Sequence, residues 1–266
     1  MITSDEPLLL VKVNIHQGVG TIILNRADRG NALSRQLVAE MQQTLLDLHQ
    51  QRSVRAIVLT GSGSVFCSGC DLAEIHASSR EENAESQWHH DCTQLRDLLE
   101  TMLRYPKPII AAVNGAAMGT GASLLLTADV VVAGPNAIFG APEPQRGLVA
   151  GLVAPLLVFR IGAGRTANLL ISARDFSPDE ALQAGIYHEL VATDKVWAKA
   201  VQWAEQCARG APESLQLTRS LINETIGEQL ITWLSAGAAA TATARTTEAA
   251  AEGVAAFLEK RPPIWP

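Results

Sequence analysis

The sequence predicts a layered α/β fold that continues into a mainly helical C-terminal part. Three observations support this prediction. Short β-branched runs alternate with amphipathic segments of helical spacing, glycine or proline bounds many of these segments, and helix signals dominate after residue 150. Alternating strands and helices are typical of a sheet layered with helices. A length of 266 residues suits one large domain, or one domain with a helical appendage.

The first third of the chain predicts a hairpin, a helix and a further strand. Apolar and polar side chains alternate over residues 11–16, which indicates a half-buried strand, and residues 19–24 return as its partner. Ser34 is a suitable cap for the helix that follows. That helix has apolar side chains at helical spacing: Leu37, Met41, Leu45 and Leu48. Residues 54–60 are rich in β-branched side chains and predict the next strand.

The middle of the chain continues the alternation. An amphipathic helix is expected around residues 95–103, before Pro106 and Pro108. Residues 109–113 predict a buried strand, residues 119–128 a helix, and residues 129–133 another strand. No glycine fingerprint of the dinucleotide-binding type opens a helix, and no Walker phosphate loop occurs. The alternation is therefore not that of a regular nucleotide-binding fold.

The C-terminal part carries strong helix signals. Ser177 and Glu180 flank Pro178 as a capping box, and Gly185 is a suitable end for that helix. Another helix is expected over residues 194–209, stopped by a glycine at 210. Residues 228–260 are rich in alanine and threonine. Small side chains there fit either a plain surface helix or a closely packed interface helix, and the sequence leaves both open.

Charge and hydropathy exclude several classes of protein. The net charge is −6 and no basic stripe occurs, so a nucleic-acid-binding protein is disfavoured. The N-terminus is acidic and polar, unlike a signal peptide. The longest apolar stretch, residues 109–128, is interrupted by Asn114 and three glycines, so we expect no membrane association. A cytoplasmic location is the simplest expectation.

Two of the four cysteines, Cys67 and Cys70, form a C-x-x-C pattern. A zinc site would need a second pair of ligands, and neither Cys92 nor Cys207 supplies one. A redox pair at the start of a helix is not excluded by position alone. We favour the simpler interpretation of two small apolar residues beside a tight Ser-Gly turn.

Three segments combine glycine with side chains suited to chemistry. Residues 66–72 form a tight turn after a strand, residues 114–123 bring glycines to the start of a helix, and residues 137–143 end in Glu143 among apolar side chains. Free N–H groups at such positions attract negative charge. Apolar surroundings favour the protonated form of a carboxyl group and suit it to proton transfer. Each segment taken alone also fits an ordinary turn or helix cap.

In this order and spacing, the three segments resemble the crotonase superfamily, also called the enoyl-CoA hydratase/isomerase family. They match its first oxyanion loop F-x-x-G-x-D, its second loop N-G-x-A-x-G-x-G, and its F-G-x-P-E segment. Residues 26–33 are similar to the family's loop beside coenzyme A, and residues 253–261 match its closing stretch. The resemblance covers nearly the whole chain.

The resemblance implies a spiral of ββα repeats over residues 1–195 and a helical trimerisation region over residues 196–266. Homotrimers or homohexamers are expected. The backbone N–H groups of Cys70 and Thr120 would form the oxyanion hole, so the sulfur of Cys70 need not react. The substrate would be an acyl-CoA of the kind met in fatty acid metabolism, and no cofactor beyond its coenzyme A is implied. Contacts to it are expected from Arg26, Arg29, Ala32, Ser68, Asp71, Leu72, Gly119 and Lys260.

One departure from the family pattern decides the expected reaction. Hydratases of the family carry a second glutamate, and the matching residue here is Ser123. Serine can position a water molecule but is a poor base near neutral pH. Moving a double bond needs only one proton shuttle, so the resemblance predicts an enoyl-CoA isomerase that uses Glu143. A hydratase with one carboxylate is the alternative.

Other side chains keep further alternatives open. Arg146 could pair with a second carboxylate on the acyl chain, which would admit a diacid substrate, a decarboxylase or a hydrolase. In the resembling family, the region after the first oxyanion loop lines the acyl pocket; here it contains Glu74, His76, Trp88, His89 and His90. A protein that binds acyl-CoA without turnover is the non-enzymatic alternative. An RNA-binding member is disfavoured by the acidic charge balance.

Overall fold

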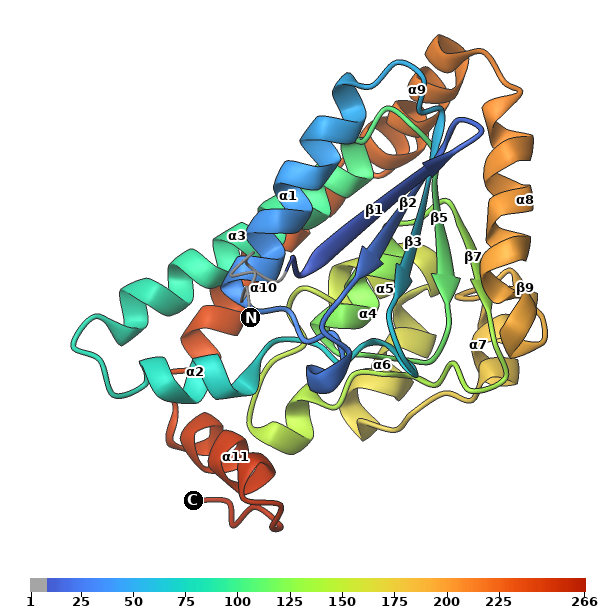
Figure 1. Cartoon of the computed structure of the whole chain (residues 1–266). Helices are drawn as coiled ribbons and strands as arrows, with labels where there is room; N and C mark the ends of the chain where they lie inside the picture. Colours follow the sequence, from blue (N-terminus) through green and yellow to red (C-terminus); the bar gives the residue numbers. More distant parts are fainter. Residues whose placement is uncertain (1–8) are drawn as a thin grey trace, which may run out of the picture.

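A computed structural model describes residues 9–266 and has a six-stranded main sheet (Figure 1). The order of its strands is β1-β2-β3-β5-β7-β9. Only the hairpin of β1 and β2 is antiparallel, and the other neighbours are parallel. The strands are β1 (Val11–His16), β2 (Val19–Leu24), β3 (Ala56–Gly61), β5 (Ile109–Val113), β7 (Val130–Ala133) and β9 (Glu189–Leu190).

A second, smaller sheet is formed by three parallel strands in the order β4-β6-β8. These are β4 (Val65–Cys67), β6 (Ala116–Met118) and β8 (Phe139–Gly140). Each of the pairs β3/β4, β5/β6 and β7/β8 adds one strand to each sheet, and helical structure follows each pair. This repeated ββα unit confirms the predicted spiral.

Helices cover both faces of the main sheet (Figure 1). The face with Ile22, Leu24 and Leu59 packs in one core with α1 (Arg35–Gln50) and α3 (Ala84–Arg104). The opposite face packs against α8 (Val196–Ala208). The remaining helices are α2 (Leu72–Ser78), α4 (Thr120–Leu126), α5 (Ala154–Ile161), α6 (Ala163–Ser172), α7 (Pro178–Ala184), α9 (Pro212–Ser220), α10 (Leu230–Ala244) and α11 (Glu248–Leu258). Residues 221–226 form a π-helical turn.

Local signals placed α1 and α7 correctly, whereas α3 begins at residue 84, well before the helix expected around residues 95–103. The whole predicted stripe of α1 is buried, and Ser34 Oγ accepts the Leu37 N–H at 3.2 Å. The capping box before α7 is present: Glu180 N–H donates to Ser177 Oγ at 3.2 Å, and Ser177 N–H donates to the Glu180 carboxylate at 2.9 Å. Caps and periodic stripes depend on neighbouring residues, which explains why the sequence alone could identify them.

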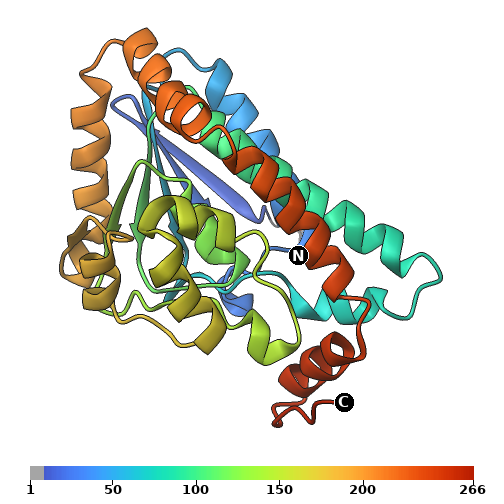
Figure 2. The same cartoon turned by 180° about the vertical axis from the view of Figure 1, so that it is seen from behind.

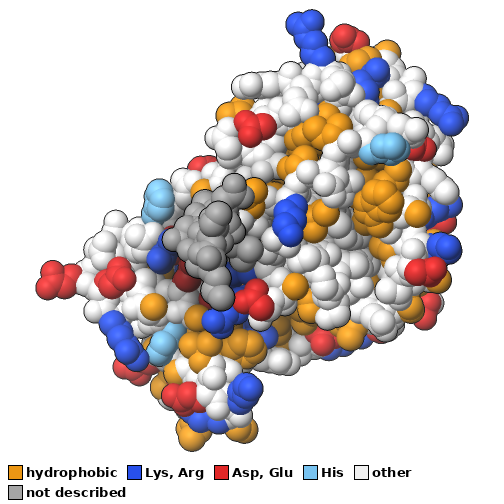
Figure 3. Space-filling model, in the orientation of Figure 1, with side chains coloured by type: hydrophobic (Ala, Val, Ile, Leu, Met, Phe, Trp, Pro, Cys, Tyr) orange, Lys and Arg blue, Asp and Glu red, His pale blue; other side chains and the backbone are white. Residues whose placement is uncertain are grey.

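The predicted half-burial of β1 is wrong. Only Val11 is buried, while Val13 and Ile15 are 39% and 46% exposed. The strand lies at the edge of the sheet, and burial of this face ends at Val11. Figure 3 shows apolar side chains at the surface in this region. The alternation of apolar and polar residues therefore predicted the strand, but it could not show whether another layer covers that strand.

The alanine-rich segment folds into α10 and α11, which pack within the chain (Figure 2). Gly237 of α10 lies so close to Gly151 that an added Cβ would be 1.9 Å from the Gly151 carbonyl oxygen. Gly253 of α11 approaches the backbone of Arg146 in the same way, with 2.3 Å for an added Cβ. Small side chains here allow close packing inside one chain, and the predicted role in trimer formation stays a prediction. No helix within residues 9–266 is long and apolar enough to cross a membrane.

Candidate active site

The three candidate segments meet because each follows one strand of the smaller sheet. Cys70 comes shortly after β4, Thr120 shortly after β6 and Glu143 shortly after β8. The carboxyl ends of parallel strands lie at the same edge of a sheet. All three residues line one narrow cavity of about 30 Å³. The structure thus brings together the three residues in which the sequence placed the chemistry.

Two backbone N–H groups, those of Cys70 and Thr120, lie at this edge. Leu33 forms a parallel bridge with Cys70: its N–H donates to the Gly69 carbonyl at 2.8 Å, and its carbonyl accepts from Asp71 at 3.2 Å. In this pairing, the Cys70 N–H points away from Leu33. Thr120 is the first residue of α4, where a helix leaves its N–H groups without an intrahelical acceptor. The pair forms a suitable oxyanion hole.

Glycines at 69 and 119 make this close arrangement possible. Both have positive φ, 102° and 53°. An added Cβ at Gly69 would lie 3.1 Å from the Met118 carbonyl oxygen, where the two loops approach each other. An added Cβ at Gly119 would lie 2.6 Å from Glu143 Oε1. Any other residue at Gly119 would therefore strain the backbone and displace the carboxylate.

Glu143 is the ionisable group of the cavity. It opens a short 3₁₀ turn, Glu143–Arg146, and only 8% of its surface is exposed. Its Oε2 is buried and has no hydrogen-bond partner among residues 9–266. Burial raises the pKa of Glu143 to about 7, although the Arg146 charge and the Thr120 backbone N–H act in the opposite direction. A carboxyl group of this kind can accept and return a proton near neutral pH.

Ser123 lies outside this cavity. Its side chain is fully buried, and its hydroxyl donates to the Leu152 carbonyl oxygen at 3.2 Å. It is not among the residues that line the cavity beside Glu143. The prediction that Ser123 positions a water molecule therefore has no support in this geometry, since the hydroxyl is already engaged.

The expected coenzyme A contacts divide into two groups. Arg26 and Asp71 pair with each other at 2.6 Å, and Arg26 also reaches the Ala32 carbonyl oxygen at 3.3 Å. Burial tends to raise the pKa of Asp71, but the hydrogen bond from Arg26 and the N–H groups of α2 lower it below its ordinary value. Arg29 and Lys260 are exposed and available to a phosphate.

The other predicted contact residues lie around the first oxyanion loop. Ser68 and Gly119 line the cavity itself, and Leu72 lines it from the start of α2. Leu72 also packs with Ile75 and Val254, which ties α2 to α11. The structure therefore gathers most of the predicted contacts at one edge of the smaller sheet.

The thiols of the C-x-x-C pattern are free and buried or partly buried. Burial raises the pKa of Cys67 to about 12, and its Sγ lies 3.1 Å from the Asn31 carbonyl oxygen. Burial also raises the pKa of Cys70, opposed by the charge of Arg245. A protonated thiol is a poor nucleophile and a poor metal ligand. The backbone of Cys70, rather than its sulfur, is the feature that suits this cavity.

The side chains proposed for the acyl pocket lie in different places. Trp88 is buried and its Nε1 donates to Ser78 Oγ at 3.1 Å. His76 faces a cavity between α2 and α11, while His90 lines a cavity of about 270 Å³ beside α1 and α3. His89 is exposed. None of these histidines is among the residues that line the cavity of Glu143.

Two residues from the C-terminal part line the Glu143 cavity and were not predicted: Thr241 and Arg245. Arg245 is the only charged residue between Glu228 and Glu248. A single charge in a run of small side chains was the signal that could have pointed to it. Arg146, which the sequence did single out, also lines the cavity, and its guanidinium lies 4.2 Å from the centre of the Phe257 ring.

Comparisons with known proteins agree with this geometry. The sequence model of the enoyl-CoA hydratase/isomerase family matches residues 14–266. A Thermus thermophilus protein, provisionally named an enoyl-CoA hydratase, is 37% identical over 94% of this chain and 99% of its own. The 2,3-dehydroadipyl-CoA hydratase of Escherichia coli is 31% identical over 94% of this chain and 96% of its own. A solved enoyl-CoA hydratase/isomerase from Pseudoalteromonas atlantica superposes with a TM-score of 0.84 at 29% identity, covering 97% of this chain and all of the other.

Proposed function

This chain belongs to the enoyl-CoA hydratase/isomerase family, and we propose that it moves a double bond within an enoyl-CoA, with Glu143 as the only proton shuttle. One observation carries the proposal. Glu143 is the only acidic residue among those that line the cavity, within the part of the chain that the structure describes. The position of the family's second glutamate is occupied by Ser123, whose hydroxyl is bonded elsewhere.

The reaction starts with the thioester carbonyl oxygen between two backbone donors. The N–H groups of Cys70 and Thr120 hydrogen-bond to this oxygen and lower the pKa of the C2–H bond. The Glu143 carboxylate takes a proton from C2 of a 3-enoyl-CoA, and the electron pair moves onto the thioester oxygen as an enolate. Each such donor contributes roughly 10² to 10³ in rate.

The second half of the reaction returns the same proton. The protonated Glu143 delivers it to C4, the enolate collapses, and the double bond now joins C2 and C3. No water or other reactant is consumed, so one carboxyl group is sufficient. A pKa near 7 suits both steps, because the carboxylate must be present to start and the acid must form without a large cost. No cofactor beyond the substrate's own coenzyme A is required.

Hydration of a 2-enoyl-CoA is the second candidate. The names of the Thermus and Escherichia coli relatives favour it. Here Glu143 alone would have to act on both the attacking water and the proton that reaches C2. Such a hydratase, which is a lyase, would work without a second carboxylate in the cavity. Decarboxylation or hydrolysis of a related acyl-CoA, and binding without turnover, are further alternatives.

The deciding experiment incubates the protein with a 3-enoyl-CoA in heavy-oxygen water and measures the product mass. We expect a 2-enoyl-CoA of unchanged mass. A 2-enoyl-CoA is tested in the same water: a 3-hydroxyacyl-CoA carrying heavy oxygen, with no conversion of the 3-enoyl-CoA, would instead establish hydration. No product from enoyl, β-keto or malonyl-type thioesters, together with coenzyme A binding, would establish a binding protein.

Two variants test the role of Glu143 in the same assay. We expect Glu143→Gln to lower turnover by about 10²- to 10⁴-fold, because it removes the general base. Glu213→Gln, at an exposed position of α9, makes the same chemical change away from the cavity and should have no effect. Unchanged turnover in Glu143→Gln would refute the mechanism.

We also propose a homotrimer or homohexamer assembled through the helical part after residue 195, in the cytoplasm. Light scattering on the purified protein would test the assembly. Particles of three or six times the 28.4 kDa chain mass are expected, and a monomer would contradict this proposal without affecting the proposed reaction.

A further inference from the structure

Arg245 is a buried cation with unused hydrogen-bonding capacity. It follows α10 directly, and its side chain is only 3% exposed. Its Nε and Nη1 have no hydrogen-bond partner among residues 9–266. A buried charge is normally paired and hydrogen-bonded, because an uncompensated one is costly to remove from water. The arrangement therefore calls for an acceptor that the chain does not itself provide.

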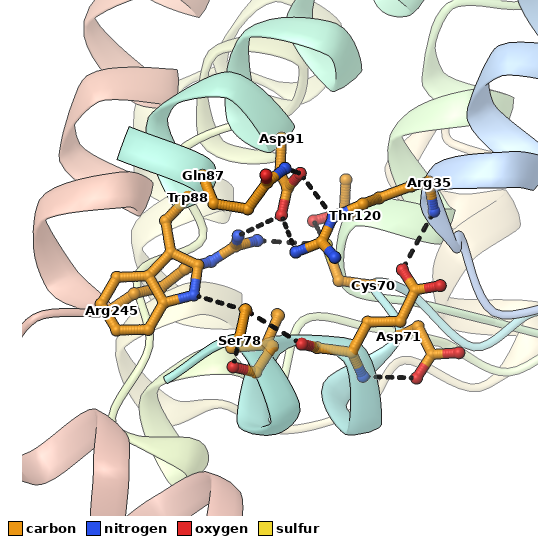
Figure 4. Close-up of polar contacts among 11 residues, drawn as sticks. Arg35, Cys70, Asp71, Ser78, Gln87, Trp88, Asp91, Thr120 and Arg245 are labelled. Carbon is orange, nitrogen blue, oxygen red and sulfur yellow. Dashed lines mark hydrogen bonds and ion pairs between the residues drawn. The ribbon is translucent and has the colours of Figure 1, made fainter. Parts of the chain in front are cut away.

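The nearest carboxylate, Asp91, already serves another cation (Figure 4). Arg35 donates to both of its oxygens, at 2.8 and 3.0 Å, and Gln87 donates to Oδ1 at 2.8 Å. Arg245 Nη1 is 3.9 Å from Asp91 Oδ2, which is too far for a hydrogen bond. Two arginines thus lie around the one carboxylate of Asp91, which hydrogen-bonds to Arg35 and not to Arg245.

Asp71 and Glu74, which line the larger cavity together with Arg245, are engaged as well. Asp71 pairs with Arg26 at 2.6 Å and caps α2. Glu74 accepts the backbone N–H of Arg35 at 3.0 Å. The remaining contact of Arg245 is from Nη2 to Cys70 Sγ at 3.8 Å, and a thiol is a weak acceptor. Nε and Nη1 of the guanidinium therefore lack an acceptor within the described part of the chain, and a planar anion such as a carboxylate could supply one.

Arg245 lines two neighbouring cavities. It lines the cavity of Glu143 and also the cavity of about 270 Å³ between α1, α2 and α3. Because three covalent bonds separate Cys70 Sγ from the Cys70 amide nitrogen, Nη2 lies within about 8 Å of that nitrogen. A thioester held by the Cys70 N–H would therefore have its acyl chain within reach of the guanidinium.

We propose that Arg245 binds a carboxylate at the far end of the acyl chain, so that the preferred substrate is the coenzyme A monothioester of a short unsaturated dicarboxylic acid. This inference rests on the proposed acyl-CoA chemistry and adds the class of acyl group. The carboxylate supplies the hydrogen bonds that Nε and Nη1 lack among the described residues. The hydrocarbon part of the chain crosses the cavity between Cys70 and Ile75, two residues that both cavities share.

Binding of saturated ligands tests the proposal without any turnover. Calorimetry would compare glutaryl-CoA with pentanoyl-CoA, which have chains of equal length and differ in the terminal carboxylate. The wild-type protein should bind glutaryl-CoA about 10- to 100-fold more tightly, the range expected for hydrogen bonds to a charged group. Equal affinity, or tighter binding of pentanoyl-CoA, would overturn the proposal. Glu143→Gln should keep the preference, because this binding measurement needs no proton transfer. A failure of the proposed reaction can then be told apart from a failure of the proposed carboxylate binding.

Variants assign the preference to a residue. Arg245→Gln should remove most of the preference for glutaryl-CoA and leave pentanoyl-CoA affinity within a few fold, whereas Arg209→Gln, at an exposed site after α8, should change neither. Arg245→Lys keeps the charge and should retain part of the preference, which covers the case in which the glutamine variant fails to fold. The opposite result would refute our inference: if Arg146→Gln lost the preference and both Arg245 variants kept it in full, Arg146 would be the residue that binds the carboxylate.

Measurements of turnover provide a further test of the role of Arg245. With 3-hexenedioyl-CoA and 3-hexenoyl-CoA as matched substrates, Arg245→Gln should lower kcat/KM for the dicarboxylic substrate by about 10- to 100-fold, mainly through KM. The monocarboxylic substrate should be nearly unaffected. An equal loss on both substrates would indicate a structural role for Arg245 and contradict the proposal.

Discussion

Replacing Glu143 by glutamine should make the protein more stable in alkaline solution, even though it removes the catalytic group. The side chain is buried, its Oε2 has no hydrogen-bond partner within residues 9–266, and burial raises its pKa from 4.5 to about 7. The folded protein therefore holds this proton more tightly than the unfolded chain does. Glutamine has nearly the same shape and never ionises, so it avoids the cost of a buried negative charge.

The sign and size follow from proton linkage. A carboxyl group with a raised pKa contributes stability that is fully present below the unfolded value near 4.5 and is lost as pH rises through 7. The shift of about 2.5 pKa units corresponds to a loss of about 3 kcal/mol, at about 1.4 kcal/mol per unit. Relative to the wild type, Glu143→Gln should therefore gain about 3 kcal/mol in free energy of unfolding between pH 4.5 and pH 8.

Denaturant unfolding at a series of pH values would measure this difference. The protomer concentration must be held constant, because assembly contributes to apparent stability. The exposed variant Glu213→Gln is the control, and its difference from the wild type should stay nearly constant with pH. A difference between wild type and Glu143→Gln that does not change across this range would refute the argument that Glu143 is buried and protonated near neutral pH.

Three further predictions follow from the same structure. For isomerisation, kcat/KM should rise with pH and level off above about 7, because the carboxylate of Glu143 is the base; a flat profile from pH 5 to 9 would contradict that role. Gly119→Ala should lower kcat/KM at least about 10²-fold, because its Cβ would lie 2.6 Å from Glu143 Oε1, and near-normal kinetics in a folded variant would show that the loop can yield. Ser177→Ala should lower the free energy of unfolding by about 1 kcal/mol without changing kcat/KM, since it removes the cap of α7; Ser177→Asp, which keeps a capping oxygen, should restore most of that stability.

The sequence predicted the elements that depend on local pattern and failed where a distant layer decides. The stripe of α1 and the caps at Ser34 and Ser177 were predictable, because each is set by residues within one or two helical turns. The exposure of Val13 and Ile15 was not, since alternation cannot tell whether a helix covers an edge strand. The hydroxyl of Ser123 is a similar case: its position in the motif was clear, but its bond to the Leu152 carbonyl oxygen depends on a segment far along the chain.

The site shows why a motif can identify chemistry without identifying a substrate. The oxyanion donors are backbone groups held by Gly69 and Gly119, so the motif retains glycines and says little about the side chains of Cys70 and Thr120. Glu143 follows the third strand of the same small sheet and is equally tied to the motif. The groups that would distinguish one acyl chain from another come instead from the end of α10, where close packing of small side chains brings Arg245 against the first loop. That segment carries no motif, and its contribution follows only from the packing of α10 on the spiral. Substitutions at Arg245 should therefore change which thioester is preferred while the proton transfer at Glu143 is retained.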